Sequence, residues 1–221
     1  MELELFFADY FPFWDNLSPK EKRALFAGTR RATYRRGDPI HGGAECTGAI
    51  IVLHGALRTY MLSEEGKEVT LYRLYDKDIC MLSASCALAA ITFEVAVEAD
   101  EDTECLILDS GMLGTLVTDN VHVKNYALEI TVGHFSEVMW IFEQILFMSF
   151  DKRLAIFLLD ECAKRQSDTI HLTHEQIAKY MGSAREVVTR MLRYFSAEGI
   201  VKSSRGDIKI TDKQKLRRLL A

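Results

Sequence analysis

Three charged residues at helical spacing, Arg185, Glu186 and Arg190, carry the clearest chemistry in this sequence. They lie in LTHEQIAKYMGSAREVVTRMLRYFSAEGIV, residues 172–201. Arginine can bind guanine O6 and N7 through two hydrogen bonds, and a carboxylate can accept a hydrogen bond from cytosine N4. A helix built only to bind phosphate would avoid a glutamate among its arginines. The mixture therefore favours a helix that reads base edges, and the alternative is a helical hairpin with a solvated charged face.

The elements that would hold these side chains are two short helices joined by a tight turn. Thr173 and Gln176 have the spacing of a capping box, which predicts a helix as far as Met181. Gly182 provides the turn, since glycine accepts a positive φ. Ser183 is then expected to cap a second helix that runs from Ala184 to Gly199. The core-facing residues of that helix are Val187, Val188, Met191, Leu192 and Phe195, and Arg185, Glu186, Thr189, Arg190 and Arg193 point outward.

A β-hairpin is expected directly after the second helix. Residues 199–201 begin one strand, SSRGD forms a turn, and IKI forms the returning strand. Side chains on such a wing can bind phosphate, which positions a domain without reading sequence. The residues predicted to contact phosphate are Thr173, Ser183, Arg193, Lys202, Ser203, Ser204 and Arg205.

The charge of the chain is divided unevenly, which fits contact with a polyanion at one end. The chain has a net charge of −5, but residues 151–221 contain 15 lysines and arginines against 9 aspartates and glutamates. The preceding 150 residues contain 12 basic and 23 acidic side chains. A basic terminal domain on an acidic body is typical of a protein that meets nucleic acid through one part only.

The first half of the chain has the pattern of a small antiparallel β-domain behind a helical start. Ser18 is expected to cap a helix that has Pro19 at its first position. Short β-type runs follow from residue 32 to residue 109, separated by turns rich in glycine. They predict a sandwich or barrel. In the run FEVAVEA, Phe93, Val95 and Val97 alternate with Glu94, Ala96 and Glu98.

A long helix is expected from residue 119 to about residue 150. Its apolar residues recur at steps of four and three, which average 3.5, the repeat of a coiled-coil seam. One interpretation is a helix that pairs with a second copy of itself, and the other is a helix packed on its own domain. The residues of this stripe are Leu128, Val132, Phe135, Met139, Phe142 and Leu146.

The order of these elements and the quoted stretch resemble the Crp/Fnr superfamily of bacterial transcription regulators. The stretch 172–201 with its wing is similar to the winged helix-turn-helix of that family. Upstream, YRRGDPIHGGAECTGAIIVLHGALRTYMLSEEGKEVTLYRLYDKDIC resembles its cyclic-nucleotide-binding β-roll. The resemblance covers nearly the whole chain. It implies an α+β protein: an antiparallel β-roll of the jelly-roll or double-stranded β-helix type over residues 1–118, a long dimerisation helix over 119–150, and a winged helix-turn-helix over 151–221.

The same resemblance assigns roles to side chains. Arg185, Glu186 and Arg190 match the base-reading positions of the family, which implies an inverted repeat containing TGA, and Thr189 lies beside them where it can tune a further base. The family also implies a homodimer through residues 121–147, which demands a palindromic operator. Its members imply double-stranded DNA and RNA polymerase as partners.

The sensory segment departs from the relatives that bind cyclic AMP. Those relatives have a Gly-Glu pair followed later by Arg-Ser-Ala, and the arginine pairs with the cyclic phosphate. This chain has Asp78-Ile79-Cys80-Met81-Leu82-Ser83 and Thr92-Phe93-Glu94-Val95 instead. A carboxylate without a cation disfavours a cyclic nucleotide, and the small apolar residues favour an apolar or gaseous ligand, or a pocket filled by side chains. The expected pocket residues are Cys80, Met81, Leu82, Cys86, Phe93 and Glu94.

The cysteines and histidines leave the cofactor unknown. The five cysteines show no CxxC pair and none precedes Cys46, so an iron–sulfur cluster is disfavoured and free buried thiols are expected. Cys80 and Cys86 leave a thiol switch or a haem-facing role open. His134 fits a dimer-interface or surface histidine better than a haem ligand. No metal site is expected.

The sequence excludes some classes of protein and leaves two rivals to the main hypothesis. The chain has 48% hydrophobic residues and no run of eighteen apolar residues, so we expect a cytoplasmic protein without membrane contact. The sequence contains no nucleophile–base pair and no phosphate-binding glycine loop, so we do not expect an enzyme. The main hypothesis is a DNA-binding regulator gated by an effector or redox signal. The rivals are a signalling subunit that regulates a protein partner, and a regulator that needs no effector.

Overall fold

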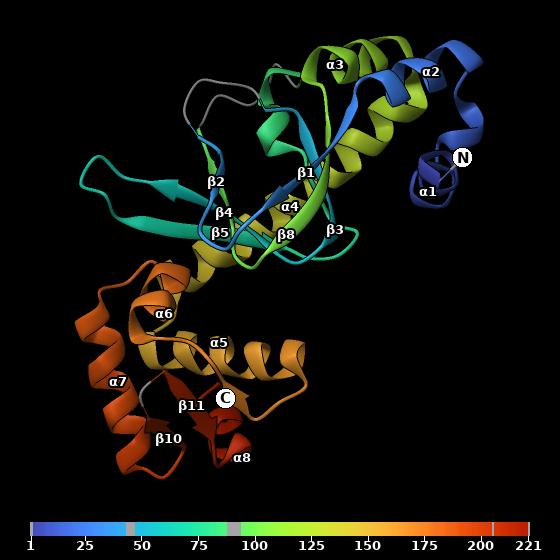
Figure 1. Cartoon of the computed structure of the whole chain (residues 1–221). Helices are drawn as coiled ribbons and strands as arrows, with labels where there is room; N and C mark the ends of the chain where they lie inside the picture. The colour runs from blue at the N-terminus through green and yellow to red at the C-terminus, as the bar shows by residue number, and fades with distance from the viewer. Residues whose placement is uncertain (1, 43–46, 88–93, 205, 221) are drawn as a thin grey trace. The chain divides into compact units, whose positions relative to one another are not determined.

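The computed structural model describes residues 2–42, 47–87, 94–204 and 206–220 (Figure 1). The chain forms two compact units. The first comprises Met1–Met61 with Leu71–Val138, and the second comprises Leu62–Thr70 with Met139–Ala221. Within the described residues, no helix is long and apolar enough to cross a membrane.

Two four-stranded sheets build the β-domain that the sequence predicts. The pairs β1–β8, β3–β8, β3–β6, β2–β7 and β4–β7 are antiparallel. One sheet has the order β1-β8-β3-β6, formed by Thr29–Tyr34, Thr103–Leu108, Ala49–His54 and Ile79–Cys80. The other has the order β2-β7-β4-β5, formed by Pro39–His41, Ala96–Ala99, Leu57–Leu62 and Glu68–Leu74.

The alternation of side chains along the strands divides the interior into two cores. Ile50 and Val52 of β3 pack with Leu57 of β4 and Val97 of β7, which closes the two sheets on each other as a β-roll. Ile51, their neighbour on β3, faces the opposite side and packs with the helices. The alternation predicted for FEVAVEA is confirmed for its described part, where Val95 and Val97 are buried and Glu94 and Glu98 are more exposed.

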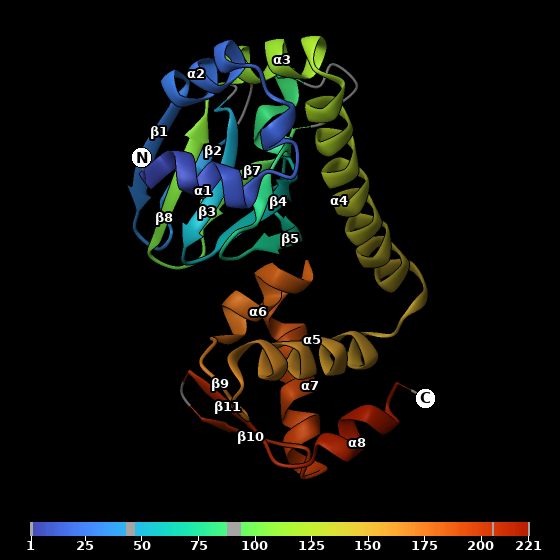
Figure 2. The same ribbon diagram turned by 90° about the vertical axis from the view of Figure 1, so that its right-hand side faces the viewer.

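Helices cover the outer face of the first sheet. Aromatic residues of α1 and the following turn, Phe7, Phe11 and Trp14, lie in the same core as Ile51, and Figure 2 shows α1 in front of this sheet. The predicted cap at Ser18 is confirmed, because its hydroxyl accepts from Glu21 N and the Glu21 carboxylate accepts from Ser18 N. These helices are α1 (Glu2–Tyr10), η1 (Trp14–Asn16), α2 (Pro19–Ala27), η2 (Leu82–Ala87), α3 (Ser110–Asp119) and α4 (Val121–Phe147).

The second unit contains the helix-turn-helix and its wing. Its elements are α5 (Phe150–Arg165), β9 (Thr169–Ile170), α6 (His174–Met181), α7 (Arg185–Ala197), β10 (Val201–Ser204), β11 (Asp207–Ile210) and α8 (Lys213–Arg218). The wing is a three-stranded sheet in the order β10-β11-β9, so the segment before α6 adds a strand to the two of the predicted hairpin. The helix α5 begins at Phe150, and Ser149 occupies its cap position without a side-chain hydrogen bond.

Candidate nucleic-acid interface

The first helix of the pair, α6, begins where the sequence predicts. The Thr173 hydroxyl accepts from Gln176 N, and the Gln176 side chain accepts from Thr173 N at 2.9 Å. Two backbone donors at the start of the helix are therefore satisfied by side chains. Ile177, Ala178 and Met181 bury the inner face of α6 in the core of the second unit.

The turn between the helices depends on Gly182. Its φ of 58° and ψ of 43° place it in the left-handed region, where a residue with a Cβ atom is strained. The next two residues correct a prediction: α7 begins at Arg185, and Ala184 rather than Ser183 occupies the cap position, without a side-chain cap. The second helix therefore begins one residue later than a cap at Ser183 predicts.

The two faces of α7 separate packing from chemistry. Val188, Leu192 and Phe195 are at most 1% exposed and anchor the helix in the core. The opposite face presents the predicted base-reading set, of which Thr189 is partly exposed and the three charged members are exposed. Together with Arg193 they line a surface hollow of about 460 Å³. The structure thus brings together on one helix face Arg185, Glu186, Thr189, Arg190 and Arg193.

The wing supplies further polar groups. β10 and β11 pair antiparallel, with Lys202 opposite Lys209 and Ser204 opposite Asp207. Lys202, Ser203 and Ser204 are exposed, as contact with phosphate requires, and Arg205 lies outside the described residues. Of the other residues predicted to contact phosphate, Thr173 and Arg193 are exposed and Ser183 is partly exposed.

One residue of this surface, His174, is absent from the sequence prediction. Its Nδ1 lies 2.9 Å from the Thr189 hydroxyl, which joins the start of α6 to the middle of α7. Burial, followed by the charges of Arg185 and Arg193, lowers the pKa of His174. No local spacing in the sequence indicates this pair, because its residues are fifteen positions apart on two different helices.

The predicted effector segment is mostly built into the cores. Cys80, Met81 and Leu82 are 0%, 1% and 6% exposed and pack with core residues. Glu94 is exposed. Phe93 and the side chain of Cys86 lie outside the described part of the chain. The described members of the predicted pocket therefore do not share one open cavity.

His134 fills space beside this segment. Its ring stacks on Tyr72 of β5, with centroids 4.3 Å apart and planes 6° apart. Its Nε2 lies 3.0 Å from the Ile79 carbonyl oxygen, and its Nδ1 lies 3.3 Å from the Glu137 carboxylate. The Tyr72 hydroxyl is in turn 4.0 Å from the Cys80 sulfur. Both ring nitrogens of His134 therefore have protein oxygens as neighbours.

The described thiols have the character of buried structural cysteines. Cys80, Cys105 and Cys162 are free and buried. Burial raises the pKa of the Cys105 thiol to about 11 and also raises that of Cys162. A protonated, covered thiol reacts slowly. In the described part of the chain, no three His, Cys, Asp or Glu side chains are grouped so as to hold a metal ion.

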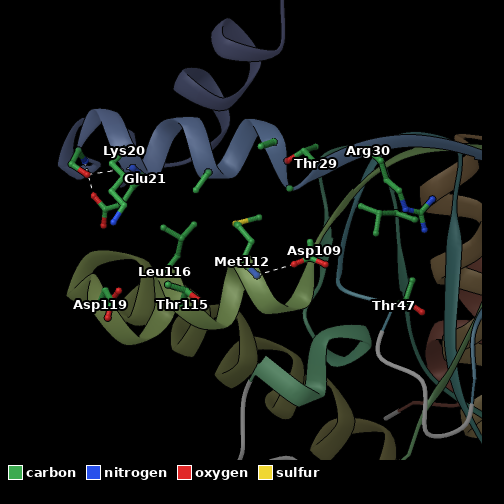
Figure 3. A pocket seen from close by; sticks show the side chains of 15 residues that line it. Lys20, Glu21, Thr29, Arg30, Thr47, Asp109, Met112, Thr115, Leu116 and Asp119 are labelled. Atoms are coloured by element: carbon green, nitrogen blue, oxygen red, sulfur yellow. Dashed lines mark hydrogen bonds between the residues drawn. The ribbon is translucent and has the colours of Figure 1, made fainter.

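A cavity of about 910 Å³ lies elsewhere in the first unit, between α2 and α3 (Figure 3). Met112 and Leu116 point into it from α3. Its polar groups are engaged locally: Asp109 accepts from Met112 N at 2.8 Å, and Glu21 accepts from Ser18 N at 2.6 Å. None of the described residues of the predicted effector segment lines this cavity.

The long helix α4 has one covered and one uncovered face. Val123 and Ala127 are buried in the first unit, and Ile130 packs against them. The predicted stripe lies on the other face of α4, where its side chains are exposed and do not pack on their own domain. The exposed fractions of the stripe are 48%, 62%, 62%, 45%, 53% and 55% for Leu128, Val132, Phe135, Met139, Phe142 and Leu146.

A winged helix-turn-helix with exposed arginines on its second helix, together with a β-roll, defines a DNA-binding transcription regulator. Residues 152–219 match the family of Crp-like helix-turn-helix domains. The chain is also similar to a crystal structure of a putative transcriptional regulator of the Crp/Fnr family from Eubacterium rectale. The two are 46% identical with a TM-score of 0.92, over 96% of this chain and 99% of that one. The protein belongs to the Crp/Fnr family of transcription regulators.

More distant relatives agree with this assignment. A probable transcriptional regulator, flp, from Lacticaseibacillus casei is 25% identical over 90% of this chain and 91% of its own length. FixK2 from Bradyrhizobium japonicum is 22% identical with a TM-score of 0.67, over 87% of this chain and 98% of that one, and supports the fold. The family, the fold class and the DNA-binding helix-turn-helix that the sequence predicts are therefore confirmed.

Proposed function

We propose that this protein acts as a homodimer that binds an inverted repeat containing TGA. The observation that carries the proposal is the single exposed face of α7 on which three arginines, a glutamate and a threonine line one hollow. An α-helix fits the major groove of DNA, and side chains near its N-terminus reach base edges. Arg185 and Glu186 occupy the first turn of α7, and Arg190 follows one turn later.

Dimerisation through α4 is the second part of the proposal. The stripe exposes large apolar side chains in sequence over about three heptads, an area that monomers rarely expose. Pairing of two such helices about a two-fold axis would cover it and would present two copies of α7 to one side of a duplex. Two-fold symmetry predicts half-sites about 10 base pairs apart. Contact with RNA polymerase stays a prediction drawn from the resemblance.

The experiment is a binding assay on operator variants with the full-length protein. Replacement of Arg190 by alanine should weaken binding by about 1–3 kcal/mol and relax selectivity at one base pair in each half-site. The matched control is Lys202→Ala on the wing, which should weaken binding to all sequences about equally. It should also reduce the slope of log affinity against log salt concentration by about one. Equal losses on every sequence for Arg190→Ala would contradict the assigned role. Insertion of half a helical turn between the half-sites should abolish tight binding.

A regulator that needs no effector is the second candidate. It is favoured by the packed state of Cys80, Met81 and Leu82 and by the His134 ring stacked on Tyr72. Operator affinity should then be equal in aerobic, anaerobic and thiol-reducing buffers. A loss of affinity on oxidation, reversed by a thiol, would support the redox switch instead, and copurification of haem would support a haem sensor.

A further inference from the structure

The hydrogen bonds of Thr189 determine which part of its side chain can meet DNA. Its hydroxyl donates to the backbone carbonyl oxygen of Arg185 at 2.9 Å, a bond within α7. The same oxygen lies 2.9 Å from Nδ1 of His174. A threonine hydroxyl has one proton, and the Arg185 carbonyl can only accept it. We therefore assign to His174 the tautomer with its proton on Nδ1, which donates to the Thr189 oxygen.

This arrangement removes the hydroxyl as a donor to a base. Guanine and adenine N7, guanine O6 and thymine O4 are all acceptors in the major groove, so they would need the hydroxyl proton that Thr189 already donates to the Arg185 carbonyl. Thr189 nevertheless lines the hollow on the exposed face of α7. Toward a base the hydroxyl can then only accept, through its second lone pair, from adenine N6 or cytosine N4, and the methyl is the group of this side chain that has no hydrogen-bonding role. In the major groove, the apolar partner for a methyl is the 5-methyl group of thymine.

The role of His174 does not depend on its charge state. Burial and the charges of Arg185 and Arg193 lower its pKa, which favours the neutral ring at pH 7. Nδ1 carries a proton both in this neutral tautomer and in the imidazolium, so the bond to Thr189 persists in either form. His174 is also partly exposed, and it begins α6 directly after the capping residue Thr173. His174 is thus held by α6, and its ring contacts the hydroxyl of Thr189 on α7.

We propose that Thr189 recognises a thymine through its methyl group and that His174 is the positioning residue that fixes this rotamer. The inference rests on the proposed function, because it assumes that α7 enters the major groove. It adds a specific chemical feature to the operator: a thymine whose methyl group, rather than its hydrogen-bonding edge, is read. The charged members of the base-reading set account for the other recognised positions.

The test replaces each thymine of one half-site by deoxyuridine, which removes only the 5-methyl group. Binding of the full-length protein is measured on each operator by fluorescence anisotropy. At one position the loss should be about fourfold, as expected for one buried methyl. Thr189→Ser, which retains the hydroxyl and lacks the methyl, should bind thymine and uracil operators equally. Thr189→Val, which retains a methyl group, should keep the preference for thymine.

Variants of His174 test the positioning role. His174→Ala should lose most of the thymine preference, and His174→Asn should restore it because its side-chain amide can donate at a similar position. A structural role alone would change affinity for both operators together and leave their ratio unchanged, which would overturn the assignment of His174. A wild-type protein that binds the repeat but shows no deoxyuridine effect overturns the thymine inference alone. Failure to prefer the repeat over scrambled DNA overturns this inference and the proposed function together.

Discussion

Replacement of Phe135 by alanine provides a quantitative test of the dimer. Phe135 lies near the middle of the stripe on α4 and is 62% exposed in the single chain. Complete burial of a phenylalanine side chain contributes up to about 3 kcal/mol, so covering the exposed part contributes about 2 kcal/mol. A two-fold interface contains the side chain twice, which gives about 4 kcal/mol per dimer. The dissociation constant of the dimer should therefore rise by up to about a thousandfold.

Sedimentation velocity over a dilution series measures this constant directly. The control variant is Leu5→Ala, which removes an apolar side chain that is 68% exposed on α1 and lies outside the stripe. It should leave the dimer unchanged. Circular dichroism of both variants should match the wild type, because neither side chain belongs to a core. A Phe135→Ala protein that is folded and dimerises as tightly as the wild type would refute the assignment of this face to a dimer interface.

Two further predictions concern the scaffold of the site and the sensory unit. Thr173→Ala removes the capping box of α6 and should lower the free energy of unfolding by about 1 kcal/mol in chemical denaturation, whereas Thr173→Ser should retain the cap. For His134, burial lowers the pKa, but hydrogen bonds to Glu137 and the Ile79 carbonyl, and the charges of Glu137 and Asp78, raise it overall above 6.5. The stabilisation from the charged ring is therefore complete below pH 6.5 and should be lost as the pH rises through the higher folded-state value. The difference in unfolding free energy between wild type and His134→Gln should shrink over that range, and a difference independent of pH would contradict this account.

Local signals in the sequence predict the start of helices well where a side chain does the capping. Ser18 with Glu21 and Thr173 with Gln176 form complete capping boxes, because each interaction spans only three residues. Gly182 is likewise predictable, because few residues other than glycine adopt its φ. The misplaced start of α7 has the opposite cause. Ala184 occupies its cap position without a side-chain hydrogen bond, so no local side-chain interaction marks this boundary.

The sensory segment shows where sequence patterns stop being informative. Small apolar residues such as Cys80 and Met81 can line a pocket or fill a core, and their types do not distinguish the two. The outcome depends on partners far along the chain, since His134 on α4 meets Tyr72 on β5 and the carbonyl of Ile79. No periodicity encodes such a contact.

The same distinction applies to the exposed face of α7. The placement of Arg185, Glu186 and Arg190 on one face could be predicted, because helical spacing alone brings them there. The chemical role of Thr189 could not be predicted, because a threonine presents either its hydroxyl or its methyl. The contact between the Thr189 hydroxyl and Nδ1 of His174, which belongs to a different helix, fixes the rotamer of Thr189. If Thr189 reads a base as proposed, specificity at this position is a property of the packing between α6 and α7, and a substitution at position 174 should change the operator that the protein prefers without altering any residue of α7.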